Sequence, residues 1–145
     1  MSSLLQWAFE SVMPSFGSQS IGFDDLLYCI RNPAKYVLIH TMSATERVLI
    51  SGTLSVAEEE VFMNEYLSKY VENQKTIVLY GRNSCDDSTR KKRAQLLSLG
   101  ISDVYIYSGG MFEWVLLQDI YGASEFPTSE VVADIIAYRP QSRFT

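Results

Sequence analysis

One cysteine and one arginine of this 145-residue chain have the spacing of an anion-binding loop. Cys85 and Arg90 are separated by four residues, and they follow the apolar run 76–80, the clearest strand pattern in the sequence. A thiol in front of a helix N-terminus can have a low pKa and act as a nucleophile, and the free backbone N–H groups there can hold an anion. One interpretation is therefore a thiol enzyme in which Cys85 is the nucleophile and Arg90 holds the anion.

Two aspartates that follow Cys85 directly favour the opposite interpretation. A carboxylate beside a thiol raises the pKa of the thiol and repels a bound anion. Asp87 or Ser88 is also a good N-cap for the helix that follows, so the acidic pair has a structural explanation. We therefore interpret Cys85 as an exposed loop thiol and expect no catalytic residue.

Four consecutive cations open the same helix, where positive charge opposes the helix dipole at a cost of a few tenths of a kcal/mol each, roughly. Either the neighbouring aspartates neutralise them, or they form a surface for an anion or an acidic protein partner, and both interpretations stay open. The candidate anion- or partner-binding residues are Arg82, Arg90, Lys91, Lys92 and Arg93.

The first segment of the chain has apolar residues at roughly helical spacing and ends at Pro14. It contains no Lys or Arg, unlike signal peptides, transit peptides and helices that lie on membranes. The segment either packs against its own domain or docks into a groove of a partner. The candidate docking residues are Leu4, Leu5, Trp7, Phe9 and Val12.

Composition excludes several classes of protein. A net charge of −5 argues against nucleic-acid binding, and no apolar run is long enough to cross a bilayer. Cys29, Cys85 and His40 are too few soft ligands for a zinc site, so we expect no metal and no cofactor. The two cysteines have no disulfide spacing, which predicts an intracellular protein of undetermined compartment. We expect His40 to be a buried histidine with satisfied ring nitrogens.

Short apolar runs alternate with helical patterns along the remaining chain. Strands are expected at residues 36–39, 48–50, 76–80 and 104–107, and helices at 23–30, 56–71, in the segment that ends at Leu99, at 111–120 and at 129–137. Ser129 is the expected cap of the last helix, and residues 15–20 are expected to be a linker. Continuously apolar strands between helices predict a parallel sheet covered on both faces, an α/β fold.

At this point the sequence resembles the rhodanese-like superfamily from about residue 20 to 127. One motif is the strand, loop and helix between Ile77 and Gly100. A second, VYIYSGGMFEW at 104–114, is similar to the family pattern V-x-x-L-x-G-G-hydrophobic-x-x-W, and LISGT at 49–53 stands where the family has H-I-P-G-A. The resemblance implies a three-layer sandwich around a parallel sheet of about five strands. It also implies an N-terminal amphipathic extension (1–19), a rhodanese-like domain (20–127) and a C-terminal extension (128–145).

The sequence departs from the family at the catalytic positions. Gly81 stands where rhodanese-like enzymes have their cysteine, and the family's acidic and basic pair falls on His40 and Met42. Inactive members of the family serve as binding or structural modules, so we expect a non-enzymatic interaction module that binds protein partners in a larger assembly. The alternative is a sulfurtransferase with Cys85 as persulfide carrier. A cysteine-dependent phosphatase is third, and its spacing would put Lys91 in the role of the arginine.

Overall fold

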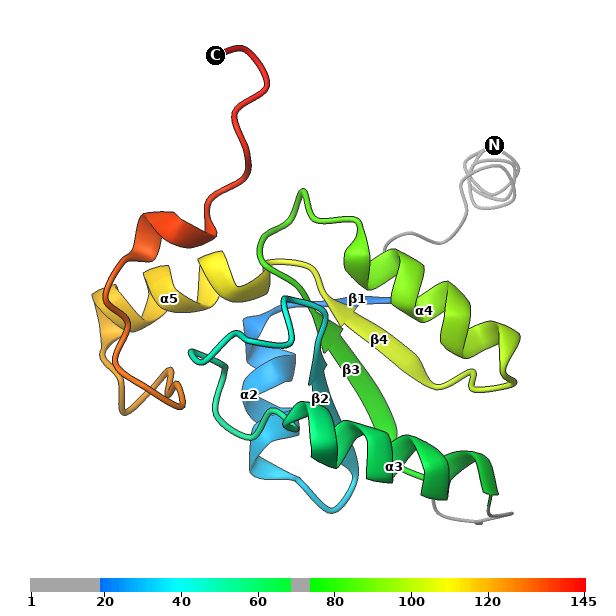
Figure 1. Cartoon of the computed structure of the whole chain (residues 1–145). Helices are drawn as coiled ribbons and strands as arrows, with labels where there is room; N and C mark the ends of the chain where they lie inside the picture. Colours follow the sequence, from blue (N-terminus) through cyan, green and yellow to red (C-terminus); the bar gives the residue numbers. More distant parts are fainter. Residues whose placement is uncertain (1–18, 69–73) are drawn as a thin grey trace, which may run out of the picture.

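The computed structural model describes residues 19–68 and 74–145, and its centre is a parallel sheet (Figure 1). The four strands lie in the order β1-β4-β3-β2, and all pairings are parallel. Their bounds are Ser20–Ile21 for β1, Tyr36–His40 for β2, Thr76–Tyr80 for β3 and Val104–Tyr107 for β4. The expected parallel α/β fold is confirmed, with four strands in the described residues where about five were expected.

Two helices cover each face of the sheet (Figure 1). α2 and α5 pack on one face, and α3 and α4 pack on the other. Their bounds are Phe23–Arg31 for α2, Val56–Ser68 for α3, Ser88–Ser98 for α4 and Gly110–Tyr121 for α5. The expected helix at 56–71 is confirmed as far as Ser68, and residues 69–73 lie outside the described residues.

β2 and β3 are buried on both faces, which is why they are largely apolar. Ile77 of β3 faces the layer of α3 and α4, whereas its neighbour Val78 faces that of α2 and α5. Trp114 of α5 is fully buried, and its indole N–H donates to the carbonyl of Pro127, 3.1 Å away. The two packed layers hold the carboxyl ends of the strands rigid, and the loops that could form a site leave the sheet there.

The expected strand at residues 48–50 is wrong. Ile50 is buried, but it forms only an isolated antiparallel bridge to Thr128. Its backbone N–H donates to the hydroxyl of Tyr80, 3.1 Å away, and Leu49 exchanges hydrogen bonds with Ser129. The segment is therefore held by one strand-end side chain and the C-terminal chain, because these partners satisfy its backbone in place of a neighbouring strand.

The expected terminal helix at 129–137 is also wrong. Only Ile135–Tyr138 is helical, as one 3-10 turn named η1. The hydroxyl of Ser129 does not cap a helix but accepts from the N–H of Leu49 and donates to the carbonyl of Arg47. The expected linker at 15–20 is corrected at its end, since Ser20 is the first residue of β1.

Candidate functional site

The candidate site is the loop of residues 81–87, which connects the carboxyl end of β3 to α4. The first N–H groups of α5 hold it, since Met111 donates to the carbonyl of Gly81 and Phe112 to that of Arg82, both at 2.9 Å. Gly110 has a φ of +67°, and a Cβ there would lie 2.9 Å from the backbone of both Asn83 and Gly81. The second glycine of the Gly-Gly motif is thus explained, because only glycine lets α5 approach the loop this closely.

The carboxylate of Asp86 accepts two backbone N–H groups, one at each end of this loop. Its Oδ2 accepts from the N–H of Arg82 at 3.0 Å, and its Oδ1 accepts from the N–H of Ser88 at 2.9 Å. Burial by itself raises the pKa of Asp86, but these hydrogen bonds and the charge of Arg82 outweigh it, so the pKa lies below its ordinary value of 3.8. The loop therefore already contains the anion that its donors bind.

The acidic pair does not cap α4 in the expected way. Asp87 is the N-cap residue, but its side chain makes no capping hydrogen bond and instead pairs with the guanidinium of Arg90. Asp86, one residue earlier, supplies the carboxylate that binds the first N–H of the helix, that of Ser88. The path of the loop decides this exchange of roles, because it turns Asp86 inward and Asp87 outward.

Gly81, the residue directly after β3, is closed off by the same carboxylate. A Cβ at this position would lie 2.7 Å from Oδ2 of Asp86 and 3.2 Å from Oγ1 of Thr41. Thr41 in turn hydrogen-bonds the hydroxyl of Ser88 at 2.6 Å. The position from which a side chain would point into the loop is therefore filled by an acidic group and a hydroxyl.

Cys85 lies on the outer side of the loop, and its side chain is exposed, as expected. Its backbone N–H donates to Oδ1 of Asn83 at 3.0 Å, which forms an Asx turn within the loop. Cys29 is the other thiol of the chain; it is buried under the sheet, and burial raises its pKa to about 11.

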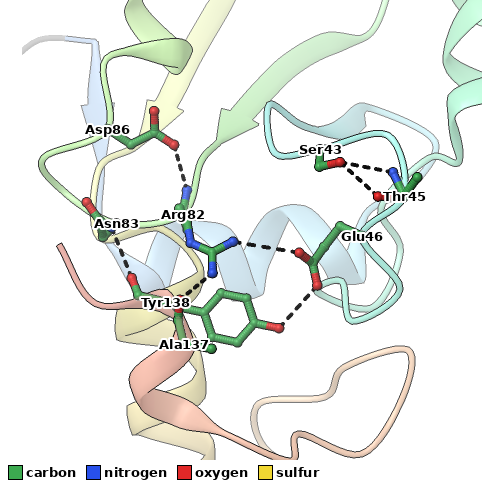
Figure 2. Close-up of polar contacts among 8 residues, drawn as sticks. All are labelled: Ser43, Thr45, Glu46, Arg82, Asn83, Asp86, Ala137 and Tyr138. Atoms are coloured by element: carbon green, nitrogen blue, oxygen red, sulfur yellow. Dashed lines mark hydrogen bonds and ion pairs between the residues drawn. The ribbon is translucent and has the colours of Figure 1, made fainter. Parts of the chain in front are cut away.

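The five cations do not form one cluster. Arg90 pairs with Asp87, Lys92 with Glu59 of α3 at 3.2 Å, and Nε of Arg93 donates to the carbonyl of Val104 at 3.0 Å. Lys91 is exposed. Arg82 points to the opposite side, toward the C-terminal segment (Figure 2). The charges at the start of α4 are thus largely matched by local acceptors.

Arg82 and Asn83 of the loop bind the C-terminal segment through their side chains (Figure 2). The Arg82 guanidinium donates to the carbonyl of Ala137, lies 5.1 Å from the centre of the Tyr138 ring and is 3.8 Å from Oε2 of Glu46. The side-chain amide of Asn83 donates to the carbonyl of Tyr138 at 3.0 Å. Sequence reasoning missed Glu46 and Tyr138, because no local pattern connects residues so far apart in the chain.

A cleft of about 550 Å³ opens between the loop and the C-terminal segment. Residues of the loop form one side, and Arg139 and residues 141–143 form the other. Cys85 lines this cleft, together with Asp86 and Asp87. The cleft contains both the sulfur that could carry chemistry and the charges that could bind a partner.

His40, at the end of β2, is buried as expected, but its ring nitrogens are not all satisfied. Its Nδ1 has no hydrogen-bond partner among the described residues. Burial lowers the pKa of His40, although the nearby carboxylates of Glu59 and Glu46 act in the opposite direction. A buried imidazole in this state is neutral at physiological pH.

The remaining sequence expectations have these outcomes. The proposed docking residues Leu4, Leu5, Trp7, Phe9 and Val12 lie outside the described residues. In residues 19–68 and 74–145, no group of three metal-ligating side chains comes together, and no helix is long and apolar enough to cross a bilayer.

Comparison with known proteins connects this geometry to a family. The sequence profile of the rhodanese-like domain matches residues 30–117, more than half of the chain. The fold is similar to that of a full-length protein from Lactobacillus plantarum, with a TM-score of 0.61 and 18% identity over 90% of this chain and 100% of that chain. It is also similar to the BH2092 protein from Bacillus halodurans, with a TM-score of 0.56 and 16% identity over 83% of this chain and 82% of that one. No curated protein matches the chain significantly.

Proposed function

The chain belongs to the rhodanese-like domain family, and we propose that it is a non-enzymatic member, an interaction module within a larger protein assembly. Cys29 and Cys85 are both free thiols, which suits a reducing, intracellular compartment. The module is proposed to consist of the domain at 20–127 with an N-terminal (1–19) and a C-terminal (128–145) extension as contact surfaces.

The observation that carries this proposal is the position of the Asp86 carboxylate. A sulfurtransferase or phosphatase loop uses its backbone N–H groups to stabilise a bound anion. Here the N–H groups of Arg82 and Ser88 are bonded to Asp86, and Gly81 offers no side chain to react. An incoming anion would have to displace a carboxylate that is covalently part of the loop, and it would meet negative charge there.

A second candidate function rests on Cys85, which is exposed and lines a cleft that also contains arginines. In this alternative the Cys85 thiolate would attack the outer sulfur of thiosulfate, form a persulfide and release sulfite. Cyanide would then take the outer sulfur as thiocyanate and regenerate the thiolate. Asp86 and Asp87 beside the thiol oppose both the thiolate and the anionic donor.

A sulfurtransferase assay with thiosulfate and cyanide separates the two functions. The wild-type chain and Cys85→Ser are compared, with Cys29→Ser as the matched control because Cys29 is buried away from the cleft. We expect no turnover above background in any of the three proteins and no persulfide on the wild type after trapping with an alkylating agent. Turnover that is lost in Cys85→Ser and kept in Cys29→Ser would overturn the non-enzymatic proposal.

A further inference from the structure

We propose that the cleft between the loop and the C-terminal segment binds an acidic segment of a protein partner. This inference deepens the proposed function and rests on it, since it names the chemistry of the partner that the module would bind. The walls of the cleft come from residues 82–87 on one side and from residues 139–143 on the other.

The charges of the cleft favour a negatively charged occupant. Three arginines line it, Arg82, Arg139 and Arg143, against two aspartates. The loop side keeps the negative charge of Asp86, while Arg82 pairs with Glu46 and Asp87 pairs with Arg90. The positive side of the cleft is the C-terminal one, where Arg139 and Arg143 stand with no acidic residue among the lining residues of that side.

The arginines on the C-terminal side have donors to offer. Nη1 of Arg139 donates to the carbonyl of Ile136, a bond that uses one of the five N–H groups of the guanidinium. Arg143 is exposed, and it stands beside the polar side chains of Gln141 and Ser142. Guanidinium groups bind carboxylates in a bidentate manner, so this edge suits Asp and Glu side chains.

The C-terminal wall of the cleft is fixed to the domain at its start, whereas the end of the chain runs away from the body of the molecule (Figure 1). Tyr138 is buried, and its hydroxyl donates to Glu46 at 3.3 Å. Arg82 and Asn83 bind the carbonyls of the two residues 137 and 138, directly before the wall begins (Figure 2). A wall anchored in this way keeps Arg139 opposite the loop, and a partner therefore loses less free energy in ordering it.

The difference in charge between the cleft and the whole chain supports a specific, oriented contact. The chain carries a net charge of −5, which opposes the approach of an acidic partner in general. An acidic segment is therefore attracted mainly to the positive side of the cleft. Such charge complementarity orients the partner and raises the association rate more than it raises the affinity. The approximate volume of 550 Å³ is large enough for several side chains.

The test uses the full chain and a short, fluorescein-labelled peptide rich in Asp and Glu, followed by fluorescence anisotropy. The double variant Arg139→Glu/Arg143→Glu is expected to weaken binding at least about tenfold. The matched control, Arg31→Glu/Lys35→Glu, makes the same change in net charge at two exposed cations outside the cleft and is expected to keep most of the affinity. Binding of the wild type is expected to weaken with salt.

Several outcomes would overturn the inference. They are no binding by the wild type, an equal loss in both double variants, or equal affinity for a Lys-rich peptide. Tighter binding of single-stranded nucleic acid than of the peptide would assign the cleft to a different class of partner. Circular dichroism of each variant shows that it is folded, and the substituted residues are all exposed. Turnover in the thiosulfate assay would overturn the proposed function, whereas the peptide titration tests the cleft alone.

Discussion

The Asp86 carboxylate stands where a side chain at residue 81 would begin, 2.7 Å from the position of a Cβ on Gly81. The two residues occupy the ends of one loop, and the N–H of Arg82 joins them through its hydrogen bond to Asp86. Gly81 and Asp86 therefore depend on each other. The carboxylate needs the space that glycine leaves, and the loop needs the carboxylate to satisfy its donors.

This dependence predicts a coupling between substitutions at the two positions. Gly81→Ala is expected to lower the free energy of unfolding by about 1–3 kcal/mol, because the new methyl group displaces a hydrogen-bonded carboxylate. In an Asp86→Ala background the same change should cost less, by about 1 kcal/mol or more. Urea unfolding of the four proteins of this double-mutant cycle measures the coupling.

A matched control exists at Gly22, where an added Cβ meets nothing within 4 Å and φ is −91°. Gly22→Ala is expected to change stability less than Gly81→Ala. Equal costs of Gly81→Ala with and without the Asp86 carboxylate would show that the carboxylate does not fill this space in solution.

Asp86→Asn is expected to alter the acid limb of the stability curve. The pKa of Asp86 is lower in the folded chain than its ordinary value of 3.8, so its contribution to stability is complete above pH 3.8 and is lost as pH falls through the folded pKa. The amide keeps an oxygen for one N–H but places an NH₂ against the other. The variant should be less stable by about 1 kcal/mol at neutral pH.

Chemical unfolding across the acid range tests this expectation, and the wild type and the Asn variant should converge as pH falls below 3.8. Asp119→Asn is a suitable control, because Asp119 is exposed on α5 and lies outside the loop. A difference between wild type and Asp86→Asn that stays constant down to the lowest pH would contradict a charged Asp86 as the loop's acceptor.

The buried His40 is expected to make the stability of the fold depend on pH in a second range, with stability falling as pH falls. Burial lowers its pKa below the ordinary 6.5, so below pH 6.5 the unfolded chain binds a proton that the folded chain does not. Stability should therefore fall as pH drops from 6.5 toward the folded pKa, and His40→Gln should remove this slope. Since His40 is the only histidine, its imidazole proton signals in NMR report the folded pKa directly.

A measured pKa at or above 6.5 in the folded chain would contradict this prediction. It would mean that the carboxylates of Glu46 and Glu59, which favour the protonated ring, outweigh burial. Glu59→Gln provides the matching control, since it removes one of these charges and should lower the pKa of His40 further.

Arg82→Lys is expected to release the C-terminal segment although it keeps the charge. Lysine has no planar fork to bind the carbonyl of Ala137 while it faces Tyr138 and Glu46. The loss should be about 1–2 kcal/mol in unfolding free energy. Limited proteolysis after residue 128 should become faster, as measured by mass spectrometry of the fragments.

Arg139→Lys is the control for this experiment, because the Arg139 guanidinium bonds only locally, to the carbonyl of Ile136. It should leave the rate of proteolysis near that of the wild type. If Arg82→Lys also leaves the C-terminal segment protected, the buried ring of Tyr138 alone is enough to hold it.

The regular elements were predictable where the pattern is local. The strands expected at 36–39, 76–80 and 104–107 are confirmed, and their order with the helices predicts a parallel sheet. β2 and β3 are largely apolar because they are buried on both faces, whereas β4 exposes Tyr105. One of the three motifs behind the resemblance to the rhodanese-like family contains the Gly-Gly pair, and the structure explains its second glycine by the contact of Gly110 with the loop.

The sequence-based predictions are wrong where the backbone of an apolar run, or the hydroxyl of a capping residue, has more than one possible hydrogen-bond partner. Residues 48–50 have strand composition, but the hydroxyl of Tyr80 and the chain near Ser129 satisfy their backbone. Ser129 has the composition of a helix cap, and its hydroxyl is used by Leu49 and Arg47 instead. Such choices depend on which distant groups are near, so a single segment cannot settle them.

The sequence by itself determined the class of fold and the absence of a cysteine after β3, because burial pattern and residue identity are local properties of the chain. Only the tertiary structure decided which group fills the loop and where its charges point. Asp86 and Asp87 are adjacent and chemically identical, yet one accepts the loop's N–H groups and the other pairs with Arg90. The path of the backbone between β3, α4 and α5 makes that distinction, and it is set by packing among segments far apart in sequence.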